Sequence, residues 1–362
     1  MEITKIGFFG LGLIGGSLAK TIHRIYPHIS MIAYDINKEA LQQAHAEHIT
    51  EPVQDMAQFT DCDVLFLCAP VHTNVTFLKK IKDQLSPQCI LSDVGSVKGN
   101  IHAAIRELGL QKQFIGGHPM AGSEKSGYAN ATAYLFENAY FILTPSPEFP
   151  TETVLEFRDF FASLSVLPLV LKPECHDFVT AAISHVPHVL AASLVNMVRV
   201  LDSRDETMKS IAAGGFKDIT RIASSSPVMW QQICLTNRDQ ILRVLTTFRE
   251  QLGILEDAIT SSDADAIYDF FDHSKKYRDS FCNTNRGPLK SIYCLYCDLI
   301  DETGGIARVA QLLADHNINL KNIGIRHNRE HQDGVLLIEF YDEASVALAS
   351  DLLTRHNYTI YA

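Results

Sequence analysis

The sequence predicts an α/β domain with a parallel sheet, then an all-α domain, then a small α+β domain. Three observations predict this order. Short β-rich runs alternate with helical patterns up to about residue 170, only helical periodicity is present from about 174 to 283, and the remaining residues return to mixed strands and helices. A chain of 362 residues is long enough for two or three domains.

The first domain, 1–172, is predicted from its regular alternation. Such alternation is typical of parallel strands joined by crossover helices. A helix, FRDFFASL, and a last strand, VLPLVL, end the domain before Lys172 and Pro173. The earlier strand candidates are KIGFFG, SMIAYD, DVLFLCAP, CILSDVG, FIGGHP and AYFILTP.

The rest of the chain is predicted as a helical domain, a linker and a tail. Residues 173–284 contain long amphipathic patterns, and a helical domain with so much apolar surface is expected to pack against a second copy as a homodimer. The Gly-Pro break in 285–290 marks a linker. The tail, 291–362, has the order βαββαβ of a ferredoxin-like sandwich.

Composition excludes several classes of partner. A net charge of −11 argues against a nucleic-acid or anionic membrane partner. No uninterrupted apolar run approaches the roughly 20 residues of a membrane span, and the N-terminus runs directly into a strand, so we expect a cytoplasmic protein. The eight cysteines are thinly spread and should be reduced. Cys294 and Cys297 would point to opposite faces of a strand, so no metal site is expected.

A glycine-rich loop follows the first strand. Gly10, Gly12 and Gly15 form G-x-G-x-x-G at the start of a helix, where glycine allows a tight turn, close approach of pyrophosphate and close helix packing. Asp35 ends the second strand twenty positions after Gly15, where a carboxylate binds ribose hydroxyls and repels a 2'-phosphate. This context favours a Rossmann-type NAD site over a plain tight βα connection. The predicted NAD contacts are Gly10, Gly12, Leu13, Ile14, Gly15, Asp35, Ala69, Pro70 and Ser96.

Two polar residues end neighbouring strands at the edge of the sheet where ligands bind. Ser96 lies in SDVGSVKG and His118 in GGHPMAG, so the two side chains are placed to meet over the nicotinamide. A neutral imidazole accepts the proton of a substrate hydroxyl when hydride leaves an alcohol carbon. The alternative is that His118 only caps a strand end.

The helical domain offers two further candidates. His185 and His188 lie three apart on one helical face around Pro187, as a metal pair or as a polar helix face, and no acidic third ligand is evident nearby. Arg221 either pairs with Asp218 or binds a substrate carboxylate through its bidentate fork.

Together, the strings GLGLIGGSLA, SDVGSVK, GGHPMAGSEKSG, ISHVPH and GGFKDITRIASSSPVMW resemble bacterial prephenate dehydrogenases, and the tail resembles an ACT regulatory module. The resemblance implies NAD-dependent oxidative decarboxylation of prephenate to 4-hydroxyphenylpyruvate in tyrosine biosynthesis. It also implies that His118 accepts the hydrogen bond of the ring hydroxyl and Ser96 orients His118. Arg221 would bind a prephenate carboxylate and His188 would place Arg221, while Ser123, Glu124 and Trp230 would line the substrate pocket.

The resemblance of the tail to ACT modules implies L-tyrosine as an effector. Its expected contacts are Asp301, Gly304, Asn317 and Asn319, and the alternative is that the tail only assists oligomerisation. Two positions depart from the family pattern. Lys217 stands where arginine is frequent, and Thr303 where ACT modules often have proline.

Other functions remain open at this point. The substrate alternative is arogenate, as in arogenate or cyclohexadienyl dehydrogenases. A non-catalytic NAD-binding amino-acid sensor would not need Ser96, His118, His188 and Arg221 together. A β-hydroxyacid dehydrogenase usually takes its proton-transfer lysine from the helical domain, whereas the histidine motif here belongs to the first domain.

Overall fold

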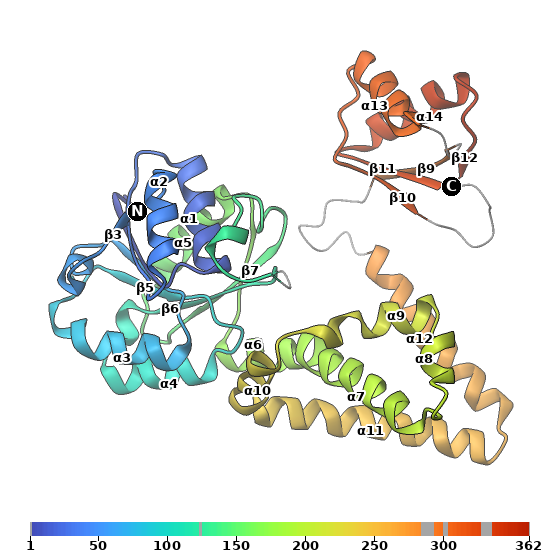
Figure 1. Cartoon of the computed structure of the whole chain (residues 1–362), viewed down its shortest axis with the longest axis horizontal. Coiled ribbons are helices and arrows are strands. Elements are labelled where there is room, and N and C mark those ends of the chain that lie inside the picture. Colours follow the sequence, from blue (N-terminus) through green and yellow to red (C-terminus); the bar gives the residue numbers. More distant parts are fainter. Residues whose placement is uncertain (1, 123–124, 284–292, 300–302, 327–334, 362) are drawn as a thin grey trace. The chain divides into compact units, whose positions relative to one another are not determined.

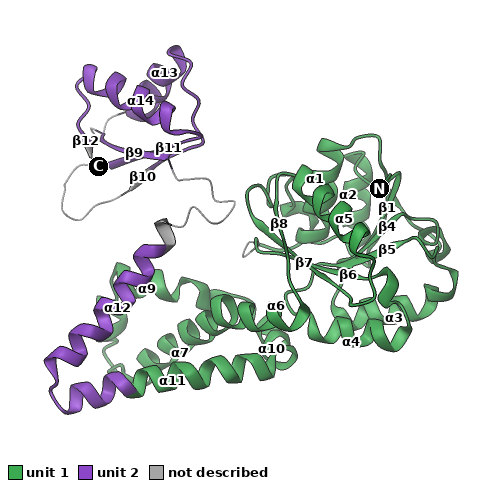
Figure 2. Ribbon diagram, turned by 180° about the vertical axis from the view of Figure 1, so that it is seen from behind, with its two compact units in different colours: residues 1–253 green, residues 254–362 purple. Residues whose placement is uncertain are grey.

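The computed structural model describes residues 2–122, 125–283, 293–299, 303–326 and 335–361 (Figure 1). The chain divides into two compact units, residues 1–253 and 254–362 (Figure 2). This division falls inside the long helix α11 (Arg238–Thr260). The domain boundaries predicted from the sequence do not coincide with this division, and they remain a prediction.

The first unit contains the predicted parallel sheet. Its strand order is β3-β2-β1-β4-β5, and every neighbouring pair is parallel. Each long strand coincides with a predicted run, and only the two-residue β3 was not predicted. The strands are β1 (Lys5–Phe9), β2 (Ser30–Tyr34), β3 (Glu51–Pro52), β4 (Val64–Leu67) and β5 (Ile90–Asp93).

The next three strands correct the expectation of a wholly parallel domain. The strands β6 (Ile115–Pro119), β7 (Tyr140–Pro145) and β8 (Leu167–Val170) form a second sheet in which β6 and β7 are antiparallel. Among the described residues that join them, the one helical segment is the short turn η4 (Tyr128–Asn130). A parallel connection needs a crossover of a dozen or more residues, usually a helix. Helix α5 (Thr151–Ser163) provides one, and β7 and β8 are parallel.

Helices cover both faces of the five-stranded sheet (Figure 1). Ile6 and Phe8 of β1 belong to one buried cluster with α1 and α5, and Phe9 belongs to the opposite cluster with α3 and α4. This alternation follows from the two-residue period of a strand and explains its continuous apolar run. The covering helices besides α5 are α1 (Leu13–Ile25), α2 (Lys38–Ala46), α3 (Val71–Ile81) and α4 (Gly99–Leu108).

The remainder of the first unit is helical, as predicted. Between α6 and α7 the segment Ala181–His185 (η5) is a π-helical turn, directly before Pro187. Proline lacks an N–H donor and its ring crowds the preceding turn, which a local π-bulge relieves. The elements are α6 (Pro173–Thr180), η5, α7 (Val186–Leu201), α8 (Thr207–Ile211), α9 (Gly214–Thr220), η6 (Arg221–Ser224), α10 (Pro227–Thr236) and the start of α11.

One helical stretch differs from the expectation about membranes. Pro173–Leu201 is long and apolar enough to cross a bilayer by length and composition alone, and 28% of its most apolar window is buried. The same stretch contains the buried polar residues His176, Asp177, Thr180 and His185. A core or interface helix passes the same test, and these buried polar side chains suit a helix inside a protein.

The second unit contains the end of α11, helix α12 (Ala264–Asn283) and a small antiparallel-sheet domain. The predicted βαββαβ order is confirmed, and the sheet order is β10-β11-β9-β12. The two helices bury Val309, Leu313 and Leu353 in one core with Leu295 and Leu336 of the sheet. The elements are β9 (Tyr293–Asp298), α13 (Gly305–Asp315), β10 (Asn322–Arg326), β11 (Val335–Phe340), α14 (Glu343–Arg355) and β12 (Ile360–Tyr361).

Candidate active site

The glycine loop has the geometry of a dinucleotide cradle. Gly10 has a φ of +99°, and a Cβ there would lie 2.7 Å from the backbone nitrogen of Ala69. A Cβ at Gly12 would meet nothing within 4 Å, so the space beside this residue is open. Helix α1 starts at Leu13 with no side-chain cap and no acidic residue in its first turn. Its N–H groups are therefore available to an anion such as pyrophosphate.

Asp35 lies beside this loop. Its Oδ2 accepts a hydrogen bond from the Leu11 amide at 2.6 Å, and its Oδ1 accepts one from the Asn37 amide at 2.7 Å. The carboxylate is thus held where the adenosine ribose of a dinucleotide would lie. Ala69 and Pro70 follow β4, and the buried Asn74 fixes this turn by donating to the Ala69 carbonyl at 2.7 Å.

A buried ion pair joins the ends of β5 and β6. The Lys98 side chain is fully buried, and its Nζ lies 2.7 and 2.6 Å from the two carboxylate oxygens of Asp93. The same Nζ donates to the carbonyl of Gly117 at 2.6 Å. Lys98 therefore ties the loop that carries Ser96 to the strand that carries His118.

His118 is the first member of a chain of hydrogen bonds. Its Nδ1 lies 2.8 Å from Nε2 of His176, and Nδ1 of His176 lies 2.8 Å from Oδ1 of Asp177. Burial lowers the pKa of His118 well below its ordinary value, and positive charge on His176, Lys98 or His185 lowers it further. The imidazole is therefore neutral at physiological pH and can accept a proton.

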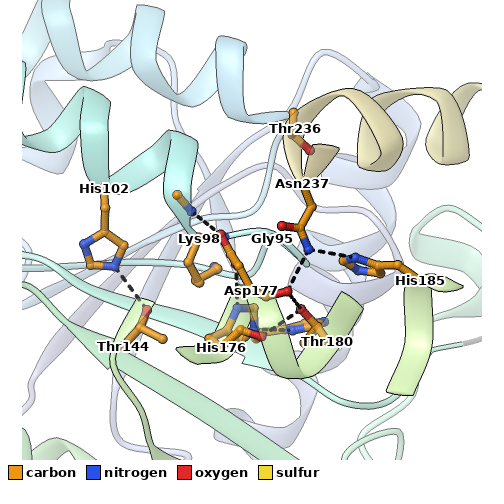
Figure 3. A network of polar contacts seen from close by, with 12 residues as sticks. Gly95, Lys98, His102, Thr144, His176, Asp177, Thr180, His185, Thr236 and Asn237 are labelled. Atoms are coloured by element: carbon orange, nitrogen blue, oxygen red, sulfur yellow. Dashed lines mark hydrogen bonds and ion pairs between the residues drawn. The ribbon is translucent and has the colours of Figure 1, made fainter. Parts of the chain in front are cut away.

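Asp177 connects the helical region to the first sheet. Its two carboxylate oxygens accept hydrogen bonds from the amides of Lys98 (2.8 Å) and Gly99 (2.7 Å) at the start of α4, where no local side chain caps the helix (Figure 3). Burial alone would raise the pKa of Asp177, but hydrogen bonds from His176 and these two amides lower it below its usual range. Asp177 thus stays ionised near neutral pH.

Three of the predicted substrate-binding residues, Arg221, His188 and Trp230, lie in the helical region. His188 donates from Nδ1 to the Ser184 carbonyl at 2.8 Å and stacks on Trp230, with ring centroids 4.1 Å apart. Within the described part of the chain, the buried Nε1 of Trp230 has no hydrogen-bond partner. Arg221 begins the short helix η6, and its side chain is exposed.

The two histidines predicted as a possible metal pair have other partners. Nδ1 of His185 lies 3.0 Å from Nδ2 of Asn237, while His188 is bonded and stacked as described. No group of three or more metal-ligating side chains occurs in the residues that the structure describes.

Several predicted contacts are not formed by direct bonds, and others lie outside the description. In the described ranges, Ser96 makes no hydrogen bond with His118, whose partner is His176. Ser123, Glu124 and Asp301 lie outside the described residues. Gly304 has a φ of +87° and caps α13, and Asn317 has a φ of +57° at the end of the same helix.

Sequence analysis missed Lys98, His176, Asp177 and Asn237. Lys98 comes soon after a buried strand and lies five residues after Asp93, which was a signal for a buried ion pair, and the His-Asp pair at the start of an apolar helix was another. His176 and Asp177 contact residues of the first domain that lie 58 to 79 positions earlier in the chain. No local sequence pattern reveals such contacts.

Comparison with known proteins gives a consistent result over most of the chain. Residues 18–167 match the family "Prephenate dehydrogenase, nucleotide-binding domain", and residues 172–273 match "Prephenate dehydrogenase, dimerization domain". The prephenate dehydrogenase of Bacillus subtilis (strain 168) is 35% identical over 338 residues, which are 92% of this chain and 91% of that protein.

Two solved structures are similar to nearly the same extent. The prephenate dehydrogenase from A. aeolicus, in complex with hydroxyphenyl propionate and NAD+, has a TM-score of 0.72 and 30% identity, covering 78% of this chain and 99% of that one. The Synechocystis arogenate dehydrogenase has a TM-score of 0.71 and 29% identity, covering 77% and 100%.

Proposed function

This chain belongs to the prephenate dehydrogenase family, and from that premise we propose that it oxidises prephenate to 4-hydroxyphenylpyruvate with the loss of carbon dioxide. The observation that carries the proposal is the neutral, hydrogen-bonded His118 near the end of β6, a strand that Lys98 ties to the end of β5 in the NAD-type sheet. When bound, NAD supplies the acceptor for the hydride that leaves ring C4.

The residues of the glycine loop suit that cofactor. The open space at Gly12 and the uncapped start of α1 suit the pyrophosphate of NAD. The fixed carboxylate of Asp35 suits its adenosine ribose. The proposed contacts are Gly10, Gly12, Leu13, Ile14, Gly15, Asp35, Ala69, Pro70 and Ser96.

The proposed work of His118 is proton transfer at one oxygen. Its neutral imidazole accepts the proton of the C4 hydroxyl as the ring is oxidised. The C1 carboxylate leaves as carbon dioxide, and its bonding electrons make the ring aromatic. The same proton then returns to the oxygen as the phenol forms, so no proton is released overall. Because aromatisation provides a large driving force, the enzyme mainly has to position the reacting groups.

The helical region is proposed to bind the rest of the substrate. Arg221 would pair with a carboxylate, His188 would place the side chain, and Trp230 would close the pocket, with Ser123 and Glu124 near its entrance. The stacking of His188 on Trp230 supports a rigid wall on this side. A guanidinium is suited to a carboxylate because its planar fork donates two parallel hydrogen bonds.

We also propose that the protein is a cytoplasmic homodimer. Large apolar side chains are exposed on α7 and α11, among them Met197, Val200, Leu201 and Leu242, and the matching family is described as a dimerization domain. A dimer interface would cover such a face, which explains the apolar composition of Pro173–Leu201 without a membrane.

The tail is proposed to be an ACT module that binds L-tyrosine at Asp301, Gly304, Asn317 and Asn319. The βαββαβ order supports this proposal, and the left-handed backbone at Gly304 and Asn317 places both residues in tight turns at the two ends of α13. The competing role is oligomerisation alone.

Arogenate is the second candidate substrate, since a solved arogenate dehydrogenase is as similar as a prephenate dehydrogenase. The test is to follow NADH absorbance with purified protein on each substrate, with and without tyrosine. We expect turnover of prephenate and its inhibition by tyrosine. Faster turnover of arogenate would make arogenate the preferred substrate in place of prephenate. No turnover of either compound would contradict the proposed function.

A further inference from the structure

We propose that His176 and Asp177 form a fixed relay with His118 that selects which nitrogen of the catalytic imidazole faces the substrate. His176 is then a positioning residue that acts through His118. The inference rests on the proposed function for the role of His118, but the arrangement of protons that it predicts can be measured without turnover.

The direction of each hydrogen bond follows from the chemistry of its partners. An ionised carboxylate has no proton to give, so Nδ1–H of His176 donates to Oδ1 of Asp177 at 2.8 Å. In the proposed relay His176 carries its one N–H on Nδ1, which leaves Nε2 of His176 as an acceptor. His118 therefore donates from its Nδ1–H across the 2.8 Å contact, and its Nε2 keeps a free lone pair. That lone pair is the one available to a substrate hydroxyl.

The relay is rigid because its outer members are held on several sides. The side chain of His176 is fully buried, and its backbone carbonyl accepts a hydrogen bond from Thr180 Oγ1 at 2.9 Å. The Asp177 carboxylate is held by the amides of Lys98 and Gly99, and its backbone carbonyl accepts from Asn237 at 2.8 Å (Figure 3). The imidazole of His118 therefore has a fixed partner before any ligand binds.

The charges around His118 show why the Asp177 carboxylate is the group that stabilises a protonated His118. Lys98 is paired with Asp93, and burial lowers the pKa of His185 to about 4, so His185 is neutral. On the antiparallel side, the residue paired with His118 is Ile142. When Nε2 of His118 takes the hydroxyl proton, the positive ring is stabilised through His176 by the negative Asp177. The proton returns to the substrate oxygen afterwards, and no other group gains or loses one.

The first test compares substitutions of two buried histidines. His176→Leu removes the acceptor, whereas His102→Leu removes a buried histidine that contacts Thr144 and takes no part in the relay. We expect kcat to fall roughly 10- to 100-fold in His176→Leu with KM for both substrates little changed, and to stay unchanged in His102→Leu. His176→Gln restores an acceptor and should recover part of the loss. Equal kcat for wild type and His176→Leu would overturn the relay.

The pH profile separates this role from loss of packing. Without His176, the protonated form of His118 loses the hydrogen-bond acceptor that the relay gives it, so the acidic limb of the kcat profile should move to lower pH. A move to higher pH would mean that His176 acts on His118 as a positive charge, which would overturn the relay. A lower kcat with an unmoved limb would assign His176 to packing alone.

The second test needs no variant that folds poorly. Nitrogen NMR of ¹⁵N-histidine-labelled wild-type protein, assigned by the signal lost in His118→Asn, should show His118 protonated at Nδ1 and bare at Nε2. The opposite tautomer would overturn the relay, whatever the activity. If the wild type turns over neither prephenate nor arogenate, the proposed function fails while this tautomer still tests the relay.

Discussion

The base side and the carboxylate side of the candidate site are built differently. On the base side, His176 and Lys98 are fully buried, and the hydrogen bond from His118 to His176 belongs to a network that joins α6 to the ends of β5 and β6. On the carboxylate side, Arg221 is exposed at the start of a four-residue helix.

This difference indicates how the work is divided. The proposed base, His118, is hydrogen-bonded in position before substrate arrives, so changes there should lower kcat. Arg221 lies on the surface and its proposed role is to bind a carboxylate rather than to take part in proton transfer, so changes there should raise KM. Four predictions test this division, in order of decreasing effect.

His118→Asn should have the largest effect. Because an amide cannot accept the hydroxyl proton, kcat should fall by roughly 10² to 10⁴-fold, the contribution of general acid–base help. NAD affinity, measured by calorimetry, should be unchanged since the glycine loop is intact. An unaltered kcat would remove His118 from the reaction.

Arg221→Ala should act mainly on KM for the substrate. Loss of a charged hydrogen bond of about 1.5 to 3 kcal/mol corresponds to a rise of roughly 10- to 100-fold, with a smaller change in kcat. Lys209→Ala is the control, because it removes an exposed positive charge of the same region that pairs with Glu206. If both variants raise KM equally, Arg221 attracts the substrate only through its positive charge and does not bind the carboxylate directly.

Gly12→Ala should weaken NAD alone. A methyl group there meets no protein atom within 4 Å, so the melting temperature should hold, but it would occupy the space proposed for pyrophosphate. We expect KM for NAD to rise about tenfold, or about 1.4 kcal/mol. Gly10→Ala, where the methyl meets Ala69, should lower the melting temperature as well. Normal NAD affinity in Gly12→Ala would mean that the pyrophosphate of NAD does not bind beside Gly12.

The smallest effect is the pH dependence of the wild-type enzyme. The folded pKa of His118 is lowered, so the neutral, active form persists below the ordinary pKa and is lost only at lower pH. Between pH 8 and pH 6, kcat/KM should fall by less than about twofold. A midpoint at or above pH 6.5 would show that protonation of His118 is not suppressed.

The glycine loop shows what sequence can predict. Gly10, Gly12, Gly15 and Asp35 act within one βα unit and the strand beside it, so their spacing carries the geometry. The strand positions follow equally from local runs. The antiparallel β6–β7 pair was not predicted. The relative direction of two strands depends on whether a crossover helix joins them, and the turn-rich sequence after Pro119 does not show whether it contains one.

The relay shows what sequence could not predict. Asp177 reads locally as one more polar residue in the first turns of a helix, yet it caps α4, whose start lies 78 positions earlier in the chain. Only tertiary contacts decide that His176 faces His118. The sequence placed His118 correctly at a strand end, but its partner came from another part of the chain.

A structure with NAD and a hydroxyphenyl product analogue would test most directly whether His118 and Arg221 act on one molecule. We expect Nε2 of His118 within about 3 Å of the ring oxygen, with the guanidinium of Arg221 on the carboxylate of the same ligand. A ring oxygen turned away from His118, or a carboxylate held without Arg221, would contradict it.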